Sequence, residues 1–436
     1  MFEHEIERKI ADFRELGLSE YVPRDGRVHV AAEMVSALVG SRRSGKSYRS
    51  MQVANEMIKD GFLPSIRHVC AMDFDNPVLA SMKAADLSLI QKMFLKINPE
   101  FSVKTPILFI LDEIHKIAGW ENFVIDLSRN RNWRVIVTGS SSKMLHGDVA
   151  TELRGKAITS PVYPLSFGEF MRFHGATRRP RSTGDEANVM RLFDDFLHWG
   201  SYPVMPATPA HMKEAVLRQY FDTMILRDII QRYEVPRPGA CTAAMRHCIS
   251  NISRPYTVKS VTAFVKDAGH AVGRETVTDY LRWAEDAWLL FSVPVYSSSS
   301  KEQERNYKKL YCVDWGLAQC NSAVWDGTYS RALENAVFMH LKRTYSRVQY
   351  CLTREKRQEV DFIAVDDRGK AALGVQVCMD IADAHTLKRE IEPLASVAKF
   401  YGCKENVIVT YNQEKNFAQD GVRVRAVPAW RWMLEE

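Results

Sequence analysis

The sequence predicts a mixed α/β fold class whose first third contains a parallel sheet. Apolar runs that suit buried strands alternate with segments of helical periodicity. These runs are continuous, which is typical of parallel strands covered on both faces. One run leads into a glycine-containing turn and another ends in two acids. Both features lie where ligands bind in such sheets.

The length and composition favour a soluble protein of several domains. At 436 residues the chain is too long for one small core, so about two to four domains are expected. Its 46% apolar and 26% charged residues are ordinary for a globular protein. The formal charge of +6 permits a nucleic-acid partner without requiring one.

Neither the N-terminus nor the cysteines indicate export or a membrane. Residues 1–18 read as a charged amphipathic helix without the apolar centre of a signal peptide. No apolar run approaches the roughly 20 residues of a membrane helix. The eight cysteines form no C-x-x-C pair, which argues against disulfides and zinc and favours a cytoplasmic location.

The stretch LVGSRRSGKS at residues 38–47 fits the pattern G-x-x-x-x-G-K-[ST]. An apolar strand precedes it, and a helix that ends near Gly61 follows. This order suits a phosphate-binding loop, because the loop's N–H groups and the helix N-terminus both attract anions. The alternative is an ordinary turn between a strand and a helix.

A phosphate-binding loop here predicts ATP and Mg²⁺ as the ligands. Lys46 would neutralise the β- and γ-phosphates, and Ser47 would bind Mg²⁺. The nucleotide-binding residues expected in the loop are Gly40, Ser41, Arg42, Arg43, Ser44, Gly45, Lys46, Ser47 and Tyr48.

The apolar run PILFILDEIHKI at residues 106–117 ends in two acids. Carboxylates at the end of a parallel strand lie at the ligand edge of the sheet. Asp112 would hold Mg²⁺, and Glu113 would polarise the attacking water, as hydrolysis requires. An apolar strand ending in Asp-Glu is also common as a purely structural feature.

A third strand, WRVIVTGSS at residues 133–141, ends in small polar residues. Thr138, Ser140 or Ser141 would sense the γ-phosphate. A helix follows and ends at Gly155, so that Arg154 lies at its end, before another strand.

Together with YPLSFGEF at residues 163–170, this arrangement resembles prokaryotic AAA-like P-loop ATPases of uncharacterised role. They are related to the archaeal ATPase and STAND groups and carry a C-terminal domain of unknown function. The resemblance covers nearly the whole chain and implies an additional-strand P-loop core with a catalytic glutamate, here Glu113.

The resemblance also implies an assembly of several copies. In ring-forming AAA ATPases, the position of Arg154 carries the arginine finger that reaches a neighbour's nucleotide, so Arg154 is expected to be catalytic with Lys46 and Glu113. Its alternative role is to complement the helix dipole. The less suitably placed arginines are Arg129, Arg131 and Arg134.

The resemblance places two further features beyond the core. GSYP at residues 200–203 is similar to the Gly-x-x-Pro element that packs near adenine, with Pro203 as the contact, although it also reads as a simple turn. The family's Arg-Asp pair matches Arg227 and Asp228, which we interpret as contacts between lid and core.

We expect four domains. They are a P-loop ATPase core with its N-terminal helix at residues 1–165, a helical lid at 166–240, a winged helix-turn-helix at 241–300, and a restriction-endonuclease-like α/β domain at 301–436.

The winged helix-turn-helix would have helices at residues 258–268 and 274–287. On the second helix Arg274, Thr278 and Arg282 share one face, which would meet the DNA major groove. Such modules also contact proteins, and this stripe also suits an ordinary solvated face. The residues expected to face the core are Val277, Tyr280, Leu281 and Ala284.

The last domain resembles the restriction-endonuclease-like fold, in which Glu334 and Asp361 fit two metal-binding positions. The third position, normally Glu-x-Lys, is Gln376-Val377-Cys378, which lacks the metal-ligand charge and the lysine. We therefore expect an inactive nuclease domain. A basic groove for nucleic acid would use Lys342, Arg343, Arg347, Arg354, Lys356 and Arg357.

The sequence thus predicts an ATP-binding and ATP-hydrolysing enzyme whose nucleotide state controls a binding surface for DNA. Two alternatives remain. One is a signalling or assembly switch that acts on protein partners through the same ATPase. The other is an active ATP-dependent nuclease.

Overall fold

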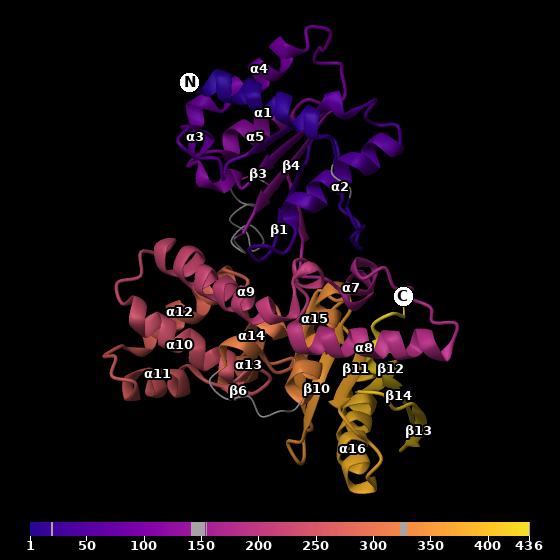
Figure 1. Cartoon of the computed structure of the whole chain (residues 1–436). Coiled ribbons are helices and arrows are strands. Elements are labelled where there is room, and N and C mark those ends of the chain that lie inside the picture. The colour runs from indigo at the N-terminus through magenta and orange to yellow at the C-terminus, as the bar shows by residue number, and fades with distance from the viewer. Residues whose placement is uncertain (19–20, 141–152, 154, 323–328, 436) are drawn as a thin grey trace. The chain divides into compact units, whose positions relative to one another are not determined.

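The computed structural model describes residues 1–436 except 19–20, 141–152, 154, 323–328 and 436 (Figure 1). The described chain forms two compact units, Met1–Tyr163 and Pro164–Glu436. Arg154, which the sequence predicts to be catalytic, and Ser141, one of the predicted phosphate sensors, lie outside the described residues.

The first unit contains a parallel sheet in the order β2-β3-β4-β1-β5 (Figure 1). Strand β4 therefore lies between β1, which leads into the glycine-containing loop, and β3, which ends in the acids. The strands are β1 (Val35–Val39), β2 (Val69–Asp73), β3 (Ile107–Asp112), β4 (Trp133–Gly139) and β5 (Ala157–Pro161).

Helices connect and cover these strands. They are α1 (Phe2–Leu16), α2 (Lys46–Lys59), α3 (Pro77–Ala80), α4 (Ser88–Ile97) and α5 (Glu121–Ser128). Val53 and Ala54 of α2 pack in one buried cluster with Leu38, Leu108 and Ile136 from three strands. This packing fixes the start of α2 at the carboxyl edge of the sheet, where β1 and β3 both end.

The second unit begins with helices. They are α7 (Phe167–Phe173), α8 (Thr183–Trp199), α9 (Ala210–Thr223), a π-helix η6 (Met224–Gln231) and α10 (Pro238–Ser250). Ser166 caps α7 by accepting the N–H of Glu169, and Glu169 accepts the N–H of Ser166 in return. This reciprocal capping box explains why α7 begins where the sequence reads SFGE.

A small sheet and two helices follow. Strands β6 (Pro255–Tyr256), β7 (Leu290–Val293) and β8 (Lys308–Cys312) form a sheet in the order β6-β8-β7. Helices α11 (Val258–Asp267) and α12 (Arg274–Asp286) lie between β6 and β7 in sequence, and α13 (Ser300–Arg305) lies between β7 and β8. The domain boundary expected near residue 300 thus falls between two strands that pair with each other.

The C-terminal part is a six-stranded sheet in the order β13-β14-β12-β11-β10-β9. Its strands are β9 (Arg347–Leu352), β10 (Glu359–Val365), β11 (Ala371–Cys378), β12 (Glu405–Thr410), β13 (Lys415–Gln419) and β14 (Val422–Pro428). The helices are α14 (Trp315–Asn321), α15 (Ser330–Thr344), α16 (Ala384–Tyr401) and α17 (Ala429–Trp432).

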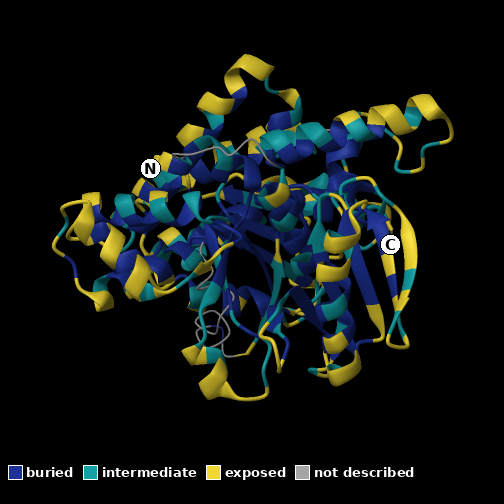
Figure 2. Cartoon of the chain, turned by 90° about the horizontal axis from the view of Figure 1, so that it is seen from below, coloured by how far each residue is buried: buried dark blue, intermediate teal, exposed yellow. Residues whose placement is uncertain are grey.

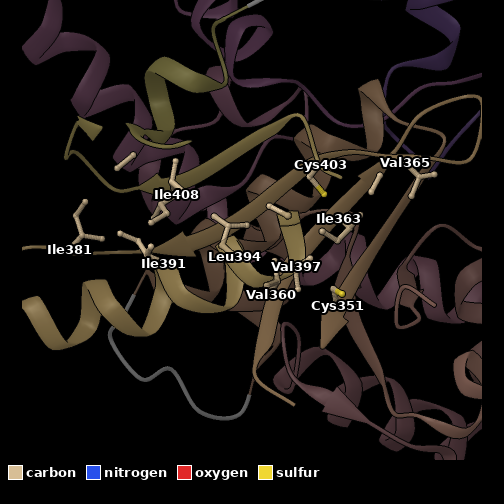
Figure 3. Close-up of a cluster of buried hydrophobic side chains, with 14 residues drawn as sticks. Cys351, Val360, Ile363, Val365, Ile381, Ile391, Leu394, Val397, Cys403 and Ile408 are labelled. Atoms are coloured by element: carbon tan, nitrogen blue, oxygen red, sulfur yellow. The ribbon is translucent and has the colours of Figure 1, made fainter. Parts of the chain in front are cut away.

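Helix α16 covers this sheet with an apolar face. Ile391, Leu394 and Val397 point toward Ile363 and Ile408 of the strands (Figure 3). Most strands are buried, but the edge strand β13 is largely exposed, and exposed residues also gather on the outer sides of the helices and in the turns (Figure 2). Among the described residues, no helix combines the length and the apolar composition needed to cross a bilayer.

Candidate functional site

The loop between β1 and α2 has the backbone geometry of an anion site. A Cβ on Gly40 would approach the carbonyl oxygen of Val162 to 2.1 Å, so only glycine fits there. Arg43 and Gly45 have φ angles of 66° and 98°, in the left-handed region. Turns of this kind direct successive N–H groups toward one concave side, where they bind anions.

Lys46 begins α2 and is only 5% exposed. Its Nζ donates hydrogen bonds to the carbonyl oxygens of Gly40 at 3.2 Å and Ser41 at 3.1 Å. The same atom lies 3.6 Å from Oε1 of Glu113. The ammonium is therefore held at the loop, and a phosphate would give it a stronger, charged acceptor.

Two hydroxyl groups of the loop fit a bound ligand. Within the described part of the chain, Oγ of Ser41 and Oγ of Ser44 are buried without a hydrogen-bond partner. Buried polar atoms are seldom left unsatisfied, because desolvation without a hydrogen bond is unfavourable. Phosphate oxygens at the loop would supply the missing acceptors.

The predicted magnesium ligands meet at the start of α2. Oγ of Ser47 donates to Oδ2 of Asp112 at 2.6 Å, and the hydroxyl of Thr138 donates to Oδ1 of the same residue. Burial raises the pKa of Asp112 above its ordinary value, and a divalent cation would oppose this shift. A carboxylate and a hydroxyl are ligands of the type that Mg²⁺ shares with substrate phosphates.

Glu113 is held as a charged group beside that site. Burial alone would raise the pKa of Glu113, but the charges of Lys46 and His115 outweigh it and lower the pKa. Nδ1 of His115 lies 3.3 Å from Oε2 of Glu113. Glu113 also has a left-handed φ of 54°, a strained conformation of the kind that persists at functional sites.

Thr138 differs from its predicted role as a sensor of the γ-phosphate. It is fully buried; its hydroxyl donates to Asp112 and accepts the N–H of Glu113 at 3.0 Å. Because its single O–H is already donated to Asp112, Thr138 connects the two acids instead of offering a donor to phosphate. Ser140 is also buried, at 1% exposure.

Of four further polar candidates in this unit, three are exposed and Arg134 is half-buried. Arg129 pairs with Asp126 and Arg131 with Glu33, at 2.8 and 3.5 Å. Tyr48 is 63% exposed. The guanidinium of Arg134 instead lies 4.4 Å from the ring centre of Phe62. Within the described part of the chain, none of the three arginines bonds to the phosphate-binding loop, whereas Tyr48 lies directly after it, in the first turn of α2.

Pro203 belongs to the second unit, so its contact with adenine stays a prediction. The preceding turn is fixed within that unit. Gly200 has a φ of 74°, and a Cβ there would approach Oδ1 of Asp314 to 2.1 Å. Asp314 accepts the N–H of Ser201 at 2.6 Å and caps α14 by accepting the N–H of Leu317.

The Arg-Asp pair lies on the π-helix η6. Asp228 is 1% exposed, and its Oδ1 lies 3.6 Å from Arg232, one turn further along. Arg227 is exposed. Residues in π-helices often serve function, but the role of this pair as a contact between lid and core stays a prediction.

The face of α12 that would meet DNA is exposed. Arg274, Thr278 and Arg282 are all exposed, and Arg282 pairs with Asp279 at 2.8 Å. The opposite face is buried as the periodicity predicts, through Val277, Tyr280, Leu281 and Ala284.

Glu334 on α15 and Asp361 on β10 both lie close to one lysine. Nζ of Lys309, on β8, lies 2.6 Å from Glu334, 2.9 Å from Glu359 and 3.4 Å from Asp361. Lys309 is 2% exposed, and the hydroxyl of Tyr311 also donates to Glu334 at 2.7 Å. An ammonium thus stands among the carboxylates of the predicted metal position. We call these five residues the Lys309 cluster.

Gln376, at the third predicted metal position, forms hydrogen bonds with other protein groups. Oε1 of Gln376 accepts the N–H of Asp361 at 3.2 Å, and its Nε2 donates to Glu390 at 2.5 Å. Burial raises the pKa of Cys378 above its ordinary value, which keeps this thiol neutral. Within the described residues, no group of three or more His, Cys, Asp or Glu side chains is arranged to hold a metal ion.

The six basic residues expected in one groove divide between the two ends of β9. Lys342 and Arg343 end α15 just before Arg347 begins the strand, and Arg343 donates to the carbonyl oxygen of Pro164 at 2.6 Å. The other three lie in the turn after β9, where Arg354 stacks on Phe400 at 3.9 Å and Arg357 pairs with Glu302.

Two parts of the chain match models of known families. Residues 32–171 match the model of an AAA domain, and residues 190–324 match a domain of unknown function (DUF8612). The first match contains the loop between β1 and α2, the acids Asp112 and Glu113, and β4, which lies between β1 and β3 in the sheet.

The relatives have no described activity. An uncharacterised protein of Methanocaldococcus jannaschii is 26% identical over 95% of this chain and 92% of its own length. An uncharacterised protein of Haemophilus influenzae is 25% identical over 91% and 94%. Among solved structures, a Walker-type ATPase of Pyrococcus abyssi has 13% identity and a TM-score of 0.41, covering 73% of this chain and 95% of that one.

Proposed function

Because residues 32–171 form an AAA domain, we propose that this protein binds ATP with Mg²⁺ and hydrolyses it. The observation that supports the proposal best is the meeting of Lys46, Asp112 and Glu113 at one loop. A buried cation, a cation ligand and a charged base are the groups that phosphoryl transfer to water requires.

Each side chain has one task in this proposal. The ammonium of Lys46 neutralises phosphate charge, and the loop N–H groups orient the phosphates. Ser47 and Asp112 hold Mg²⁺, which supplies positive charge to the phosphate oxygens when bound. Glu113, kept ionised by Lys46 and His115, orients the attacking water and accepts its proton.

The test separates binding from turnover. Lys46→Ala should abolish ATP binding, whereas Glu113→Gln should still bind ATP and turn it over at least about 100-fold more slowly. Isothermal titration measures the first effect and phosphate release the second. The matched control is Glu100→Gln, a carboxylate about half exposed that pairs with Arg67. Hydrolysis by Glu113→Gln at the wild-type rate would contradict the assignment of the base.

We further propose that the nucleotide state controls a DNA-binding surface in the second unit. The order β6, α11, α12, β7, α13 and β8 supports a winged helix-turn-helix in which α13 interrupts the wing, and the arginines of α12 are exposed. Such arginines would contact phosphates and bases. The competing function is a switch that acts on a protein partner through the same surface.

Salt dependence distinguishes these two functions. A DNA-binding function would be supported if the affinity for duplex DNA fell steeply as salt increases. The affinity should also fall in the double variant Arg274→Ala with Arg282→Ala. Lys388→Ala, which alters an exposed basic residue on α16, serves as the control. Absence of binding at low salt, with and without ATP, would favour the protein partner.

The last part of the proposal is a homo-oligomer in which two neighbouring copies form each nucleotide site. Arg154 would act on the nucleotide of a neighbouring copy and increase turnover about 1,000-fold or more. Mixing Arg154→Ala with Lys46→Ala protein should then restore some hydrolysis. A protein that stays monomeric with ATP at micromolar concentration would contradict this part.

A further inference from the structure

Arg24 links the phosphate-binding loop to the end of the first unit. Its Nη1 donates to the carbonyl oxygen of Ser44 at 2.9 Å, and its Nη2 donates to the carbonyl oxygen of Tyr163 at 2.7 Å. Charge-assisted hydrogen bonds of this kind are stronger than neutral ones. The two acceptors lie far apart in sequence, so one guanidinium fixes both segments in place.

The main chain of Arg24 is itself fixed to the helix that follows the loop. Its N–H donates to Oε1 of Gln52 at 3.0 Å, and its carbonyl oxygen accepts from Nε2 of Gln52 at 3.3 Å. Gln52 lies on α2 and is only 5% exposed. Arg24 is therefore held at its backbone as well as at its guanidinium, which gives the side chain a defined direction.

The bond to Ser44 determines the direction of a neighbouring amide. The peptide between Ser44 and Gly45 is planar, and in a trans peptide the N–H points opposite to the carbonyl. Because Arg24 holds the carbonyl of Ser44, the N–H of Gly45 points away from the guanidinium. Gly45 caps the N-terminus of α2, where an N–H group attracts phosphate.

The bond to Tyr163 reaches the point where the chain leaves the first unit. Tyr163 is the last residue of that unit, and Pro164 begins the second. The residue before it also supports the loop, since Val162 donates its N–H to Val39 at 2.7 Å and closely approaches Gly40. The start of the loop thus rests on Val162, and its end is tied to Tyr163 through Arg24.

We propose that Arg24 is a positioning residue that orients the Gly45 amide toward the nucleotide and couples the loop to the connection between the two units. This inference rests on the proposed function, since it deepens the role of the same loop. A shift of the Ser44 carbonyl on nucleotide binding or release would be transmitted through the guanidinium to Tyr163. Arg24 contacts no reacting atom in this role.

The first experiment measures the loop without nucleotide. In full-length Arg24→Ala, amide hydrogen exchange at Gly45 and Lys46 should become about tenfold faster, which corresponds to about 1.4 kcal/mol. Arg27→Ala is the matched control, because Arg27 is an exposed arginine of the same segment. Unchanged exchange at the loop in Arg24→Ala would overturn the inference, whether or not the protein binds ATP.

The second experiment measures the affinity for ATP and the effect of bound ATP on the chain near Tyr163. Arg24→Ala should bind ATP about tenfold more weakly, and Arg24→Lys, which keeps one cationic donor, should recover part of the affinity. ATP should change the amide exchange of residues 162–166 in the wild type, and this change should disappear in Arg24→Ala at saturating ATP. An equal change in both proteins, or none in a wild type that binds ATP, would overturn the coupling.

These outcomes distinguish the positioning role of Arg24 from the proposed binding of ATP. A wild type that binds no ATP contradicts the proposed function, and the exchange measured without nucleotide still decides whether Arg24 holds the loop. A wild type that binds ATP with the same affinity as Arg24→Ala contradicts the positioning role alone. Equal thermal unfolding temperatures of both proteins would show that neither result reflects misfolding.

Discussion

Single atoms decide the chemistry of the loop, and Gly40 is the simplest case. A methyl group at this position would meet the carbonyl oxygen of Val162 at 2.1 Å, closer than any two such atoms can pack. Gly40→Ala should therefore displace the loop, abolish ATP binding and lower the unfolding temperature. Gly273→Ala is the control, because a Cβ there meets nothing within 4 Å. Wild-type ATP affinity in Gly40→Ala would show that the loop adapts.

Thr138 illustrates how one hydroxyl organises two acids. Thr138→Val keeps the shape and removes the bonds to Asp112 and to the N–H of Glu113. We expect hydrolysis to slow about tenfold or more with little change in ATP affinity, because Glu113 loses its orientation while the loop stays intact. Thr138→Ser should restore most of the rate. A large loss of affinity with an unchanged rate would instead favour direct contact with the nucleotide.

The residues that a spacing pattern can identify are those close together in sequence. Gly40, Gly45 and Lys46 belong to one motif, and Asp112 with Glu113 ends one apolar run, so the sequence predicted that they share an edge of the sheet. Arg24 and Lys309 were missed. Each reaches its partners through tertiary packing, and neither stands in a motif whose spacing signals a role.

At the scale of elements, β8 supplies the cation of the Lys309 cluster to carboxylates from α15 and β10. Lys309→Met should lower the free energy of unfolding by about 3–5 kcal/mol, because it leaves buried carboxylates without their counter-ion. Lys308→Met, on the neighbouring and more exposed position of β8, should have little effect. Equal urea midpoints for the two variants would show that the cluster contributes little to stability.

The same cluster should make stability depend on pH. Burial, with the charges of Glu334 and Glu359, raises the pKa of Asp361 to about 8 although Lys309 opposes the shift. Unfolded Asp361 ionises near pH 4, so between these values the folded state retains a proton that the unfolded state releases. Stability should therefore fall as the pH rises from about 4 to about 8.

Urea midpoints at pH 5 and pH 8 measure this dependence. Asp361→Asn, which imitates the protonated carboxyl, should reduce the difference between the two midpoints. Asp367→Asn, an exposed position after β10, should leave it unchanged. A pH dependence identical in the wild type and Asp361→Asn would show that another group titrates.

Over the whole molecule, the proposed chemistry belongs to the first unit alone. We expect no cleavage of DNA or RNA with Mg²⁺ or Mn²⁺, with or without ATP, because an ammonium occupies the centre of the carboxylates and Asp361 keeps its proton near neutral pH. A gel assay with purified protein checks this. Cutting that disappears in Asp361→Ala and persists in Lys46→Ala would reveal an active nuclease.

The sequence predicted the strands of each unit better than the contacts between segments that are distant in sequence. Continuous apolar runs are a local signal, and they located β1, β3, β4 and β5 of the first unit but not β2. The six basic residues lie three near the start of β9 and three after its end, so the extended six-residue strand holds the two groups apart. The reach of Arg24 to Tyr163, in contrast, depends on how a long segment folds back.

Strand β8 finally limits how this protein can be divided for study. It pairs with β6 and β7, while Cys312 exchanges two main-chain hydrogen bonds with the side chain of Asn335 on α15. A fragment that ends near residue 300 would leave β7 without its partner. A fragment that begins after residue 312 would contain the acids without Lys309. Dissection of the second unit should therefore keep residues 255–378 in one piece.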